Sequence, residues 1–102
     1  MAYTVITKKR FENSVRKLLE YLILNWQDNV AENFLLALNH AIITTSHNPL
    51  IGTEIKGKFN IRTTLVTKHN RIYYRIEKDK IIILNMIDTR RNPKENPFKK
   101  PA

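Results

Sequence analysis

The 102-residue sequence contains no cysteine, only two glycines and no long apolar run. Without cysteine the chain can form neither disulfides nor thiolate metal sites, and its three histidines, His40, His47 and His69, lack the spacing of metal ligands. We therefore predict no metal and no cofactor. No apolar run approaches the roughly 20 residues of a membrane span, and the first residues do not form a signal peptide. These absences predict a cytoplasmic protein without membrane association.

Acidic residues are few throughout the chain, and in its second half basic residues far outnumber them. Residues 1–55 hold five basic and five acidic side chains, whereas residues 56–102 hold thirteen basic and four acidic ones, so the net charge of +9 comes from the second half. Such one-sided charge attracts anions, and the natural partners are nucleic acid, an acidic protein or an acidic peptide. The alternative is a solvated surface that only keeps the protein soluble.

Two apolar stripes with helical spacing follow a short β-branched strand at Tyr3–Thr7. The stripes cover residues 11–26 and 30–42 and predict two helices in a hairpin, with Asp28 as the N-cap of the second. One kinked helix is the alternative, because neither glycine nor proline separates the stripes. The second helix should end before Pro49, because the residue before a proline is pushed out of helical conformation.

After the helices the sequence favours three strands, at Phe59–Val66, Asn70–Glu77 and Lys80–Asp88. The connections between them are short enough only for hairpins, so the strands should be antiparallel. The prediction is an α+β fold of order β-α-α-β-β-β, with the helical hairpin on one face of a small antiparallel sheet and a basic open face. We expect one domain over residues 1–102, in which residues 92–102 form a tail rich in proline and lysine.

Alternation along the middle strand predicts which side chains that open face carries. Successive residues of a strand point to opposite faces, and the apolar helices need one face of the sheet to cover. The set expected beneath the helices is Ile72, Tyr74 and Ile76, and the set expected on the open face is Arg71, Tyr73 and Arg75.

Two further arginines are expected to extend this basic face. Arg62 is placed there on the preceding strand together with Asn60 and Thr64, and Arg91 follows the last strand. Guanidinium groups bind phosphate or carboxylate in pairs of hydrogen bonds, and a tyrosine ring offers stacking area. The candidate binding residues are Lys56, Lys58, Lys68, Tyr73, Arg75 and Arg90.

Exposed cations on a sheet also have a purely structural explanation, since they prevent edge-to-edge pairing. That explanation suits Lys78 and Lys80 better than Arg71 and Arg75, which lie mid-strand beside an aromatic ring. His69 lies in a hairpin with basic neighbours that would favour the neutral imidazole of a general base. A solvated turn histidine is the simpler interpretation of the same residue.

Four stretches of the sequence resemble the RelE/ParE superfamily of type II toxins, which includes the plasmid stabilisation system toxins. They are Tyr3–Thr7, the hairpin end at Asn48–Gly52, the strand Asn70–Ile76, and Ile82–Pro93. Their order and spacing span nearly the whole chain. The resemblance implies a growth-inhibiting toxin that is neutralised by a cognate antitoxin encoded beside it.

The superfamily divides by target, and the resemblance leaves two functions open. RelE-like members cut messenger RNA on the ribosome without metal; Arg62, Arg71 and Arg91 match basic positions of that catalytic set, with His69 or Tyr73 to move a proton. ParE-like members instead poison DNA gyrase and need no catalytic set.

The sequence departs from the RelE-like pattern at two positions, and we therefore favour the ParE-like function. Thr64 stands where RelE-like members carry a lysine, and Pro97 or Phe98 stands near their tail aromatic with a proton-transferring hydroxyl. The long hairpin of the predicted helices also looks more like the ParE-like members. A third hypothesis, from a different class, is a non-toxic basic domain that binds nucleic acid, with an affinity that falls steeply as salt rises.

Overall fold

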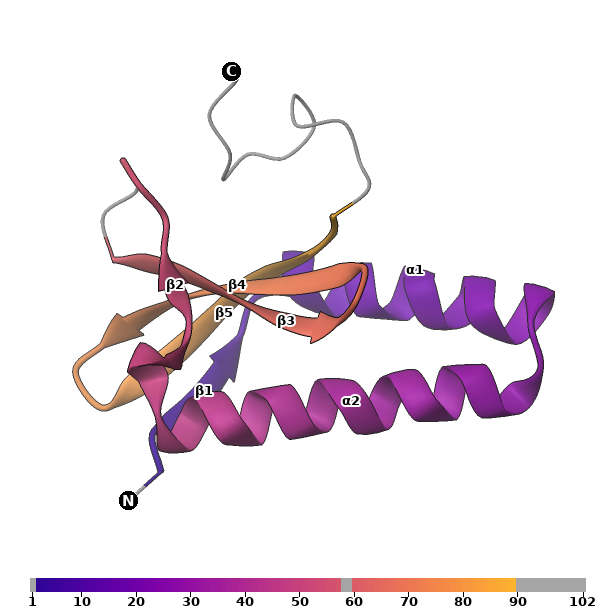
Figure 1. Cartoon of the computed structure of the whole chain (residues 1–102), viewed down its shortest axis with the longest axis horizontal. Coiled ribbons are helices and arrows are strands. Elements are labelled where there is room, and N and C mark those ends of the chain that lie inside the picture. The colour runs from indigo at the N-terminus through magenta and orange to yellow at the C-terminus, as the bar shows by residue number, and fades with distance from the viewer. Residues whose placement is uncertain (1, 58–59, 90–102) are drawn as a thin grey trace.

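The computed structural model describes residues 2–57 and 60–89 of the chain. In chain order a strand is followed by two helices, a single 3-10 turn and four more strands (Figure 1). The α+β fold predicted from the sequence is confirmed, and η1 and β2 are additions to it. The elements are β1 (Thr4–Thr7), α1 (Lys9–Asn25), α2 (Asp28–His47), η1 (Pro49–Ile51), β2 (Thr53–Glu54), β3 (Ile61–Thr67), β4 (Asn70–Glu77) and β5 (Lys80–Asp88).

The five strands form one sheet in the order β1-β5-β4-β3-β2. The β3–β4 and β4–β5 hairpins are antiparallel, as the short connections predict. β1 runs parallel to β5, with Val5 opposite Ile81, so the sheet is mixed and not wholly antiparallel. A parallel neighbour requires a long connection, which the chain between β1 and β5 supplies by way of both helices.

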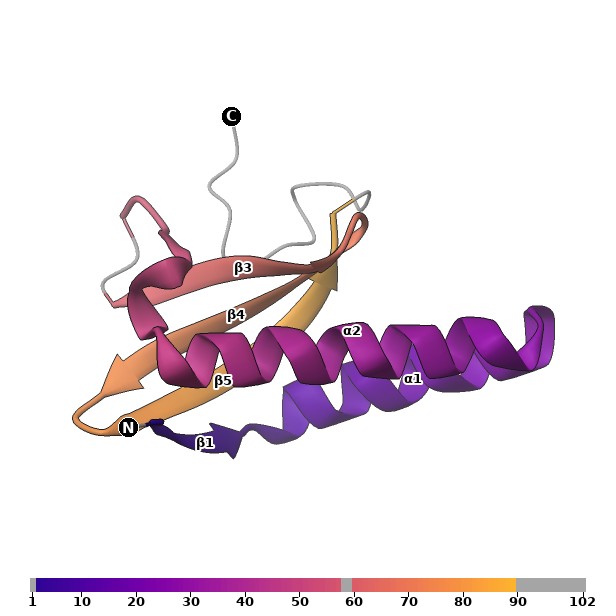
Figure 2. The same cartoon turned by 60° about the horizontal axis from the view of Figure 1, so that its bottom comes forward.

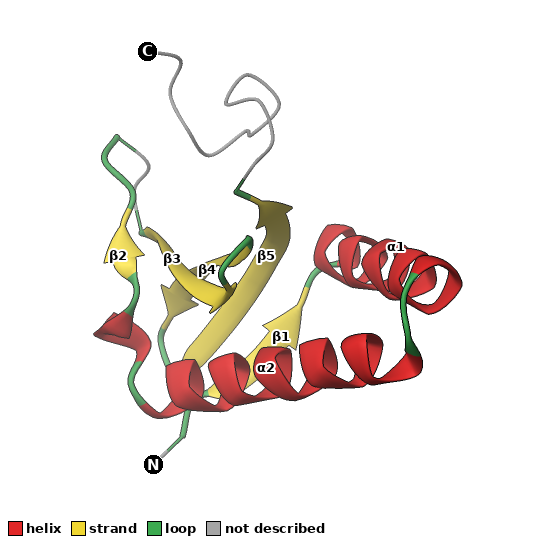
Figure 3. Ribbon diagram, turned by 45° about the vertical axis from the view of Figure 1, so that its right-hand side comes forward, coloured by secondary structure: helices red, strands yellow, loops and turns green. Residues whose placement is uncertain are grey.

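The two helices form the predicted hairpin and lie on one side of the sheet (Figure 3). Trp26 and Gln27 separate them, which shows that the alternative of one kinked helix is wrong. The N-cap position of α2 is occupied by Gln27 and not by Asp28, so the cap prediction is off by one residue. α2 ends at His47, before Asn48 and Pro49, as proposed. None of the helices in the described part of the chain is both long and apolar enough to cross a membrane.

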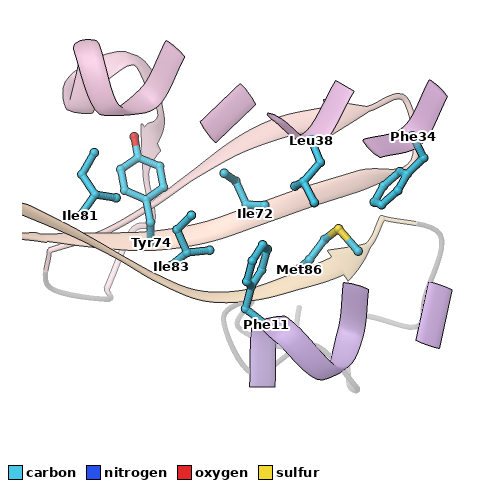
Figure 4. Packing of buried hydrophobic residues seen from close by; sticks show 8 residues of the cluster. All are labelled: Phe11, Phe34, Leu38, Ile72, Tyr74, Ile81, Ile83 and Met86. Atoms are coloured by element: carbon cyan, nitrogen blue, oxygen red, sulfur yellow. The ribbon is translucent and has the colours of Figure 1, made fainter. Parts of the chain in front are cut away.

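The core lies between the helices and the sheet face that they cover (Figure 4). Ile72 and Tyr74 of β4 are completely inaccessible to solvent, and Ile76 packs against the same cluster. This result confirms the predicted orientation of the apolar set in β4. Around these residues the buried cluster contains Phe11, Phe34, Leu38, Ile81, Ile83 and Met86.

Candidate functional site

Arg71 and Arg75 lie on the sheet face that points away from the core, here called the open face. Both alternate along β4 with the buried residues Ile72 and Tyr74, so their side chains project to the opposite face. Both arginines are partly exposed. Nε of Arg75 is 2.6 Å from a carboxylate oxygen of Glu77 on the same face. The charge of Arg75 is therefore partly offset by its neighbour, whereas Arg71 has no ion pair among the residues described.

Tyr73 lies between these arginines but does not offer an exposed ring. Only 2% of its surface is accessible, so the prediction of an open stacking surface at this position is wrong. β5 bulges opposite Tyr73, because Tyr73 pairs with Asn85 whereas Tyr74 pairs with Ile83. The side-chain oxygen of Asn85 accepts hydrogen bonds of 2.8 Å from the Ser14 hydroxyl and from the Met86 backbone N–H. The bulge is thus fixed to α1 directly beside Tyr73.

Arg62 does not lie on the open face, and its predicted placement there is wrong. It pairs directly with Tyr74, and directly opposed residues of an antiparallel pair project to the same face, here the face that the helices cover. Nη1 of Arg62 donates a 2.8 Å hydrogen bond to the carbonyl oxygen of Gly52, and Nη2 lies 3.6 Å from a carboxylate oxygen of Glu54. Arg62 therefore holds the segment that follows α2.

Tyr74 anchors the same segment from within the core. Its hydroxyl donates a 2.6 Å hydrogen bond to the Pro49 carbonyl oxygen and accepts one of 3.0 Å from the Gly52 N–H. Figure 4 shows the hydroxyl pointing away from the apolar cluster. Burial raises the pKa of this hydroxyl, while the Gly52 hydrogen bond and the charge of Arg62 act in the opposite direction. The sequence predicted Tyr74 only as a core aromatic, and this network was not foreseen.

Only glycine fits at position 52, because the Tyr74 hydroxyl and the neighbouring backbone lie too close for a side chain. A Cβ atom at this position would collide with the Tyr74 hydroxyl and would lie 2.9 Å from the Thr63 carbonyl oxygen. The sequence identified Gly52 only as the last residue of the hairpin end at Asn48–Gly52. A glycine followed by a β-branched strand is too common a pattern to reveal a buried tyrosine contact.

The remaining predicted site residues are spread over the basic half of the chain. Lys56 and Lys68 are exposed, and His69 lies in the β3–β4 turn, where its carbonyl oxygen accepts a 2.7 Å hydrogen bond from the Thr89 N–H. The end of β5 therefore adjoins this turn. Lys58, Arg90, Arg91 and the tail 92–102 lie outside the described residues. Thr64 pairs with Ile72 and thus lies on the helix side of the sheet.

An open groove of about 380 Å³ runs between α2 and β3. Leu36, Ala37 and Leu65 contribute to its largely apolar lining, together with Ile51 of η1, and none of the lining residues is acidic, lysine or arginine. β2 pairs with β3 only at Arg62 and at the residue that follows it. Beyond that point no strand within the described residues covers the outer edge of β3, so backbone hydrogen-bonding groups are available beside the groove.

Comparison with known proteins agrees with this architecture. A family model of the ParE toxin of the type II toxin–antitoxin system parDE matches residues 5–93. The chain belongs to the ParE toxin family. It is thus the toxin component of a type II module within the RelE/ParE superfamily.

Solved structures share the ParE-family fold at low sequence identity. A chain of the chromosomal ParDE system from P. aeruginosa superposes with a TM-score of 0.71 at 9% identity, over 85% of this chain and 96% of that one. A chain of the toxin–antitoxin complex RelBE2 from Mycobacterium tuberculosis gives 0.62 at 16% identity, over 86% and 99%. The archaeal RelE–RelB complex from Pyrococcus horikoshii OT3 gives 0.57 at 16%, over 90% and 100%. No curated protein matches the sequence.

The ParE-family chain shows no grouping of metal ligands in its described residues. No three histidine, aspartate or glutamate side chains there are placed to hold a metal ion. The candidate site of this ParE-family member consists of two separate regions. One is the open face with Arg71, and the other is the groove beside the free edge of β3.

Proposed function

We propose that this ParE-family toxin arrests growth in the cytoplasm by poisoning DNA gyrase and is neutralised by a cognate antitoxin. The observation that carries the proposal is the separation of Arg62 from Arg71 by the sheet itself. Cleavage of RNA by the RelE-like set requires its cationic groups to converge on one phosphate, because they stabilise the charge that develops there. With Arg62 bound to Gly52 and Glu54 on the opposite side, that convergence is missing.

Two more features support a toxin that acts by binding. Tyr73, a candidate for moving a proton, is buried, and Thr64, which stands where RelE-like members carry a lysine, lies on the helix side. A gyrase poison needs none of these groups. It needs surfaces that fit a protein–DNA complex, and the basic half of the chain suits the DNA component.

The antitoxin is proposed to occupy the groove between α2 and β3. An extended segment could pair with the free edge of β3 at Leu65 and insert apolar side chains between Leu36 and Ile51. Lys68 follows the free edge of β3, so a basic group lies at one end of the groove. An acidic antitoxin carrying an apolar segment matches both features.

The gyrase proposal is tested with purified protein. We expect the toxin to block supercoiling by gyrase and to accumulate cleaved DNA, and expect the antitoxin to reverse both effects. A chain that arrests growth while leaving gyrase untouched would refute the target and would leave the toxin assignment standing. Duplex DNA without gyrase serves as the control for simple nucleic-acid binding, which should weaken steeply with salt.

RNA cleavage remains the second candidate function because of one contact. The hydrogen bond from Thr89 to His69 brings the end of β5 against the turn that precedes Arg71, so that the end of β5 lies at the same end of the sheet as His69 and Arg71. The test is cleavage of messenger RNA on translating ribosomes. Cleavage that persists in an Arg71→Ala/Arg91→Ala double variant would exclude the RelE-like mechanism.

A further inference from the structure

The loop end of the helical hairpin carries four exposed apolar side chains, here called the hairpin tip: Tyr21, Ile23, Leu24 and Trp26. Their accessible fractions are 54%, 58%, 82% and 58%. Three of them belong to the last turns of α1, and Trp26 is its C-cap residue. A helix end that is apolar around its whole circumference is typical of a buried helix, yet this one is exposed.

The exposure follows from the shape of the molecule. Both helices extend past the sheet at their loop end, as two views agree (Figures 1 and 2), so the sheet cannot cover the hairpin tip. Between Phe11 and Ala31 no residue with a described burial is fully buried. The tip therefore contributes little to the core, and its apolar character is not explained by folding.

The charge near the hairpin tip differs from that of the basic second half of the chain. Residues 18–55 contain no lysine or arginine, although the chain has a net charge of +9. Glu20 and Glu32 are exposed near the tip, and Glu20 pairs with Arg16 at 3.1 Å. The nearest cations along α1 are Arg16, which is ion-paired with Glu20, and Lys17, so nucleic acid is a poorer partner for this surface than for the basic half of the chain.

We infer that the hairpin tip docks on a protein component of the toxin's target, at an apolar surface with a basic rim. This inference rests on the proposed function and deepens it, because the target would be held at two chemically different places. DNA suits the basic half of the chain, and protein suits the apolar, acid-rimmed tip. Charge complementarity selects a lysine- or arginine-rich rim on the partner.

A second copy of the chain is a less suitable partner for the hairpin tip than a protein of the target. Four side chains of this size and exposure present on the order of 500 Å², which is comparable to the largest apolar patch of a typical monomer, and such patches are often functional. A stable dimer usually buries about 800 Å² on each partner. In a dimer formed through two hairpin tips, the glutamates of the two copies would repel each other. A basic rim on a target protein would attract them instead.

The test uses the full-length double variant Leu24→Gln/Trp26→Gln, which removes the apolar tip without changing the charge. Glutamine is a good helix former, so α1 should persist. Leu50→Gln is the matched control, because Leu50 is 66% exposed and lies on η1, at the opposite end of α2. We expect the double variant to require at least a tenfold higher level of induction to arrest growth. Its thermal midpoint and antitoxin affinity should equal those of the control.

Several outcomes would overturn the inference. Growth arrest by the double variant at the wild-type level of induction means that the tip does not contact the target. Loss of antitoxin binding in a folded double variant assigns the tip to the antitoxin, and a wild-type dimer that the substitutions dissociate assigns it to a second copy. The growth-arrest assay does not depend on which target the toxin has. A toxin that does not inhibit purified gyrase would therefore refute the gyrase proposal but not the role of the hairpin tip. A wild-type chain that arrests no growth overturns both proposals.

Discussion

Arg62 of β3 lies directly opposite Tyr74 of β4, and both side chains bind the backbone of Gly52. The Tyr74 hydroxyl accepts a hydrogen bond from the Gly52 N–H, and the Arg62 guanidinium donates one to the Gly52 carbonyl oxygen. A loop residue between α2 and β3 thus has both backbone groups satisfied by side chains from the sheet. This arrangement fixes the chain from Pro49 to Glu54 and positions one wall of the groove.

The first prediction concerns the Tyr74 hydroxyl. Tyr74→Phe leaves the Pro49 carbonyl and the Gly52 N–H without their partner in a buried site, which should lower the free energy of unfolding by about 1–3 kcal/mol. Urea denaturation measures the loss. Tyr21→Phe removes a hydroxyl from a ring that is 54% exposed and should change stability by less than about 0.5 kcal/mol. Equal stability of the two variants would contradict the proposed role of the hydroxyl.

The second prediction concerns pH. Burial raises the pKa of Tyr74 above the usual value of 10.0, so the folded chain keeps this proton at pH values where the unfolded chain has lost it. The contribution to stability is therefore complete below about pH 10 and is lost as pH rises through the folded-state pKa. Wild type should lose stability more steeply than Tyr74→Phe as the pH rises above about 10. Parallel curves for the two proteins would show that Tyr74 does not titrate as described.

The third prediction couples Gly52 to Tyr74. Gly52→Ala should be strongly destabilising, because the added methyl group collides with the Tyr74 hydroxyl. In a Tyr74→Phe background that oxygen is absent, so the same substitution should cost less, by roughly 0.5–3 kcal/mol of coupling energy. A double-mutant cycle on unfolding free energies measures the coupling. Strict additivity would mean that the clash with Thr63 alone determines the cost.

The orientation of β4 was predictable because it depends on one strand alone. The alternation of Ile72, Tyr74 and Ile76 with polar residues has period two, and an apolar helical hairpin can cover only the apolar face. This deduction does not depend on how β4 pairs with its neighbours, and the burial of Ile72 and Tyr74 confirms it.

The orientation of Arg62 depends on register between strands, which the sequence does not display. The turn pairs Thr67 with Asn70, and a regular ladder continuing from there would place Arg62 opposite Arg75 on the open face. An irregularity between Leu65 and Thr67 shifts the register by one residue and places Arg62 opposite Tyr74 instead. A shift of one residue moves a side chain to the other face of the sheet. Neither glycine nor proline marks this bulge.

The burial of Tyr73 was not predicted either. It lies opposite the second irregularity, in β5, where Asn85 is held by Ser14 of α1. Residues 81–87 are apolar except for Asn85, and nothing in this pattern shows that the strand bulges there. A contact between residues 71 positions apart cannot be deduced from local periodicity.

The fourth prediction separates the two arginines that the sequence had grouped together. Arg62→Gln should lower the free energy of unfolding by about 1–3 kcal/mol, because a charged hydrogen bond to Gly52 is lost. Arg71→Gln should leave the thermal midpoint unchanged and should weaken growth arrest and the salt dependence of nucleic-acid binding. Thermal unfolding and induced-growth assays on both variants provide the comparison. An Arg71 variant with full toxicity and an unchanged salt slope would remove the open face from the proposed mechanism.

The fifth prediction tests the groove as the antitoxin site. Ala37 of α2 is partly exposed and lines the groove, so Ala37→Glu introduces a charge where an apolar segment of the antitoxin should insert. Burying that unpaired carboxylate on complex formation is costly, and we expect antitoxin affinity to fall at least tenfold. Asn33→Glu adds the same side chain at an exposed position of the same helix outside the groove, and it should bind the antitoxin as wild type does. Calorimetric titration of both folded variants measures the difference. Equal affinities would move the antitoxin to another surface, whereas weakening by Ala37→Glu alone would place it between α2 and the free edge of β3.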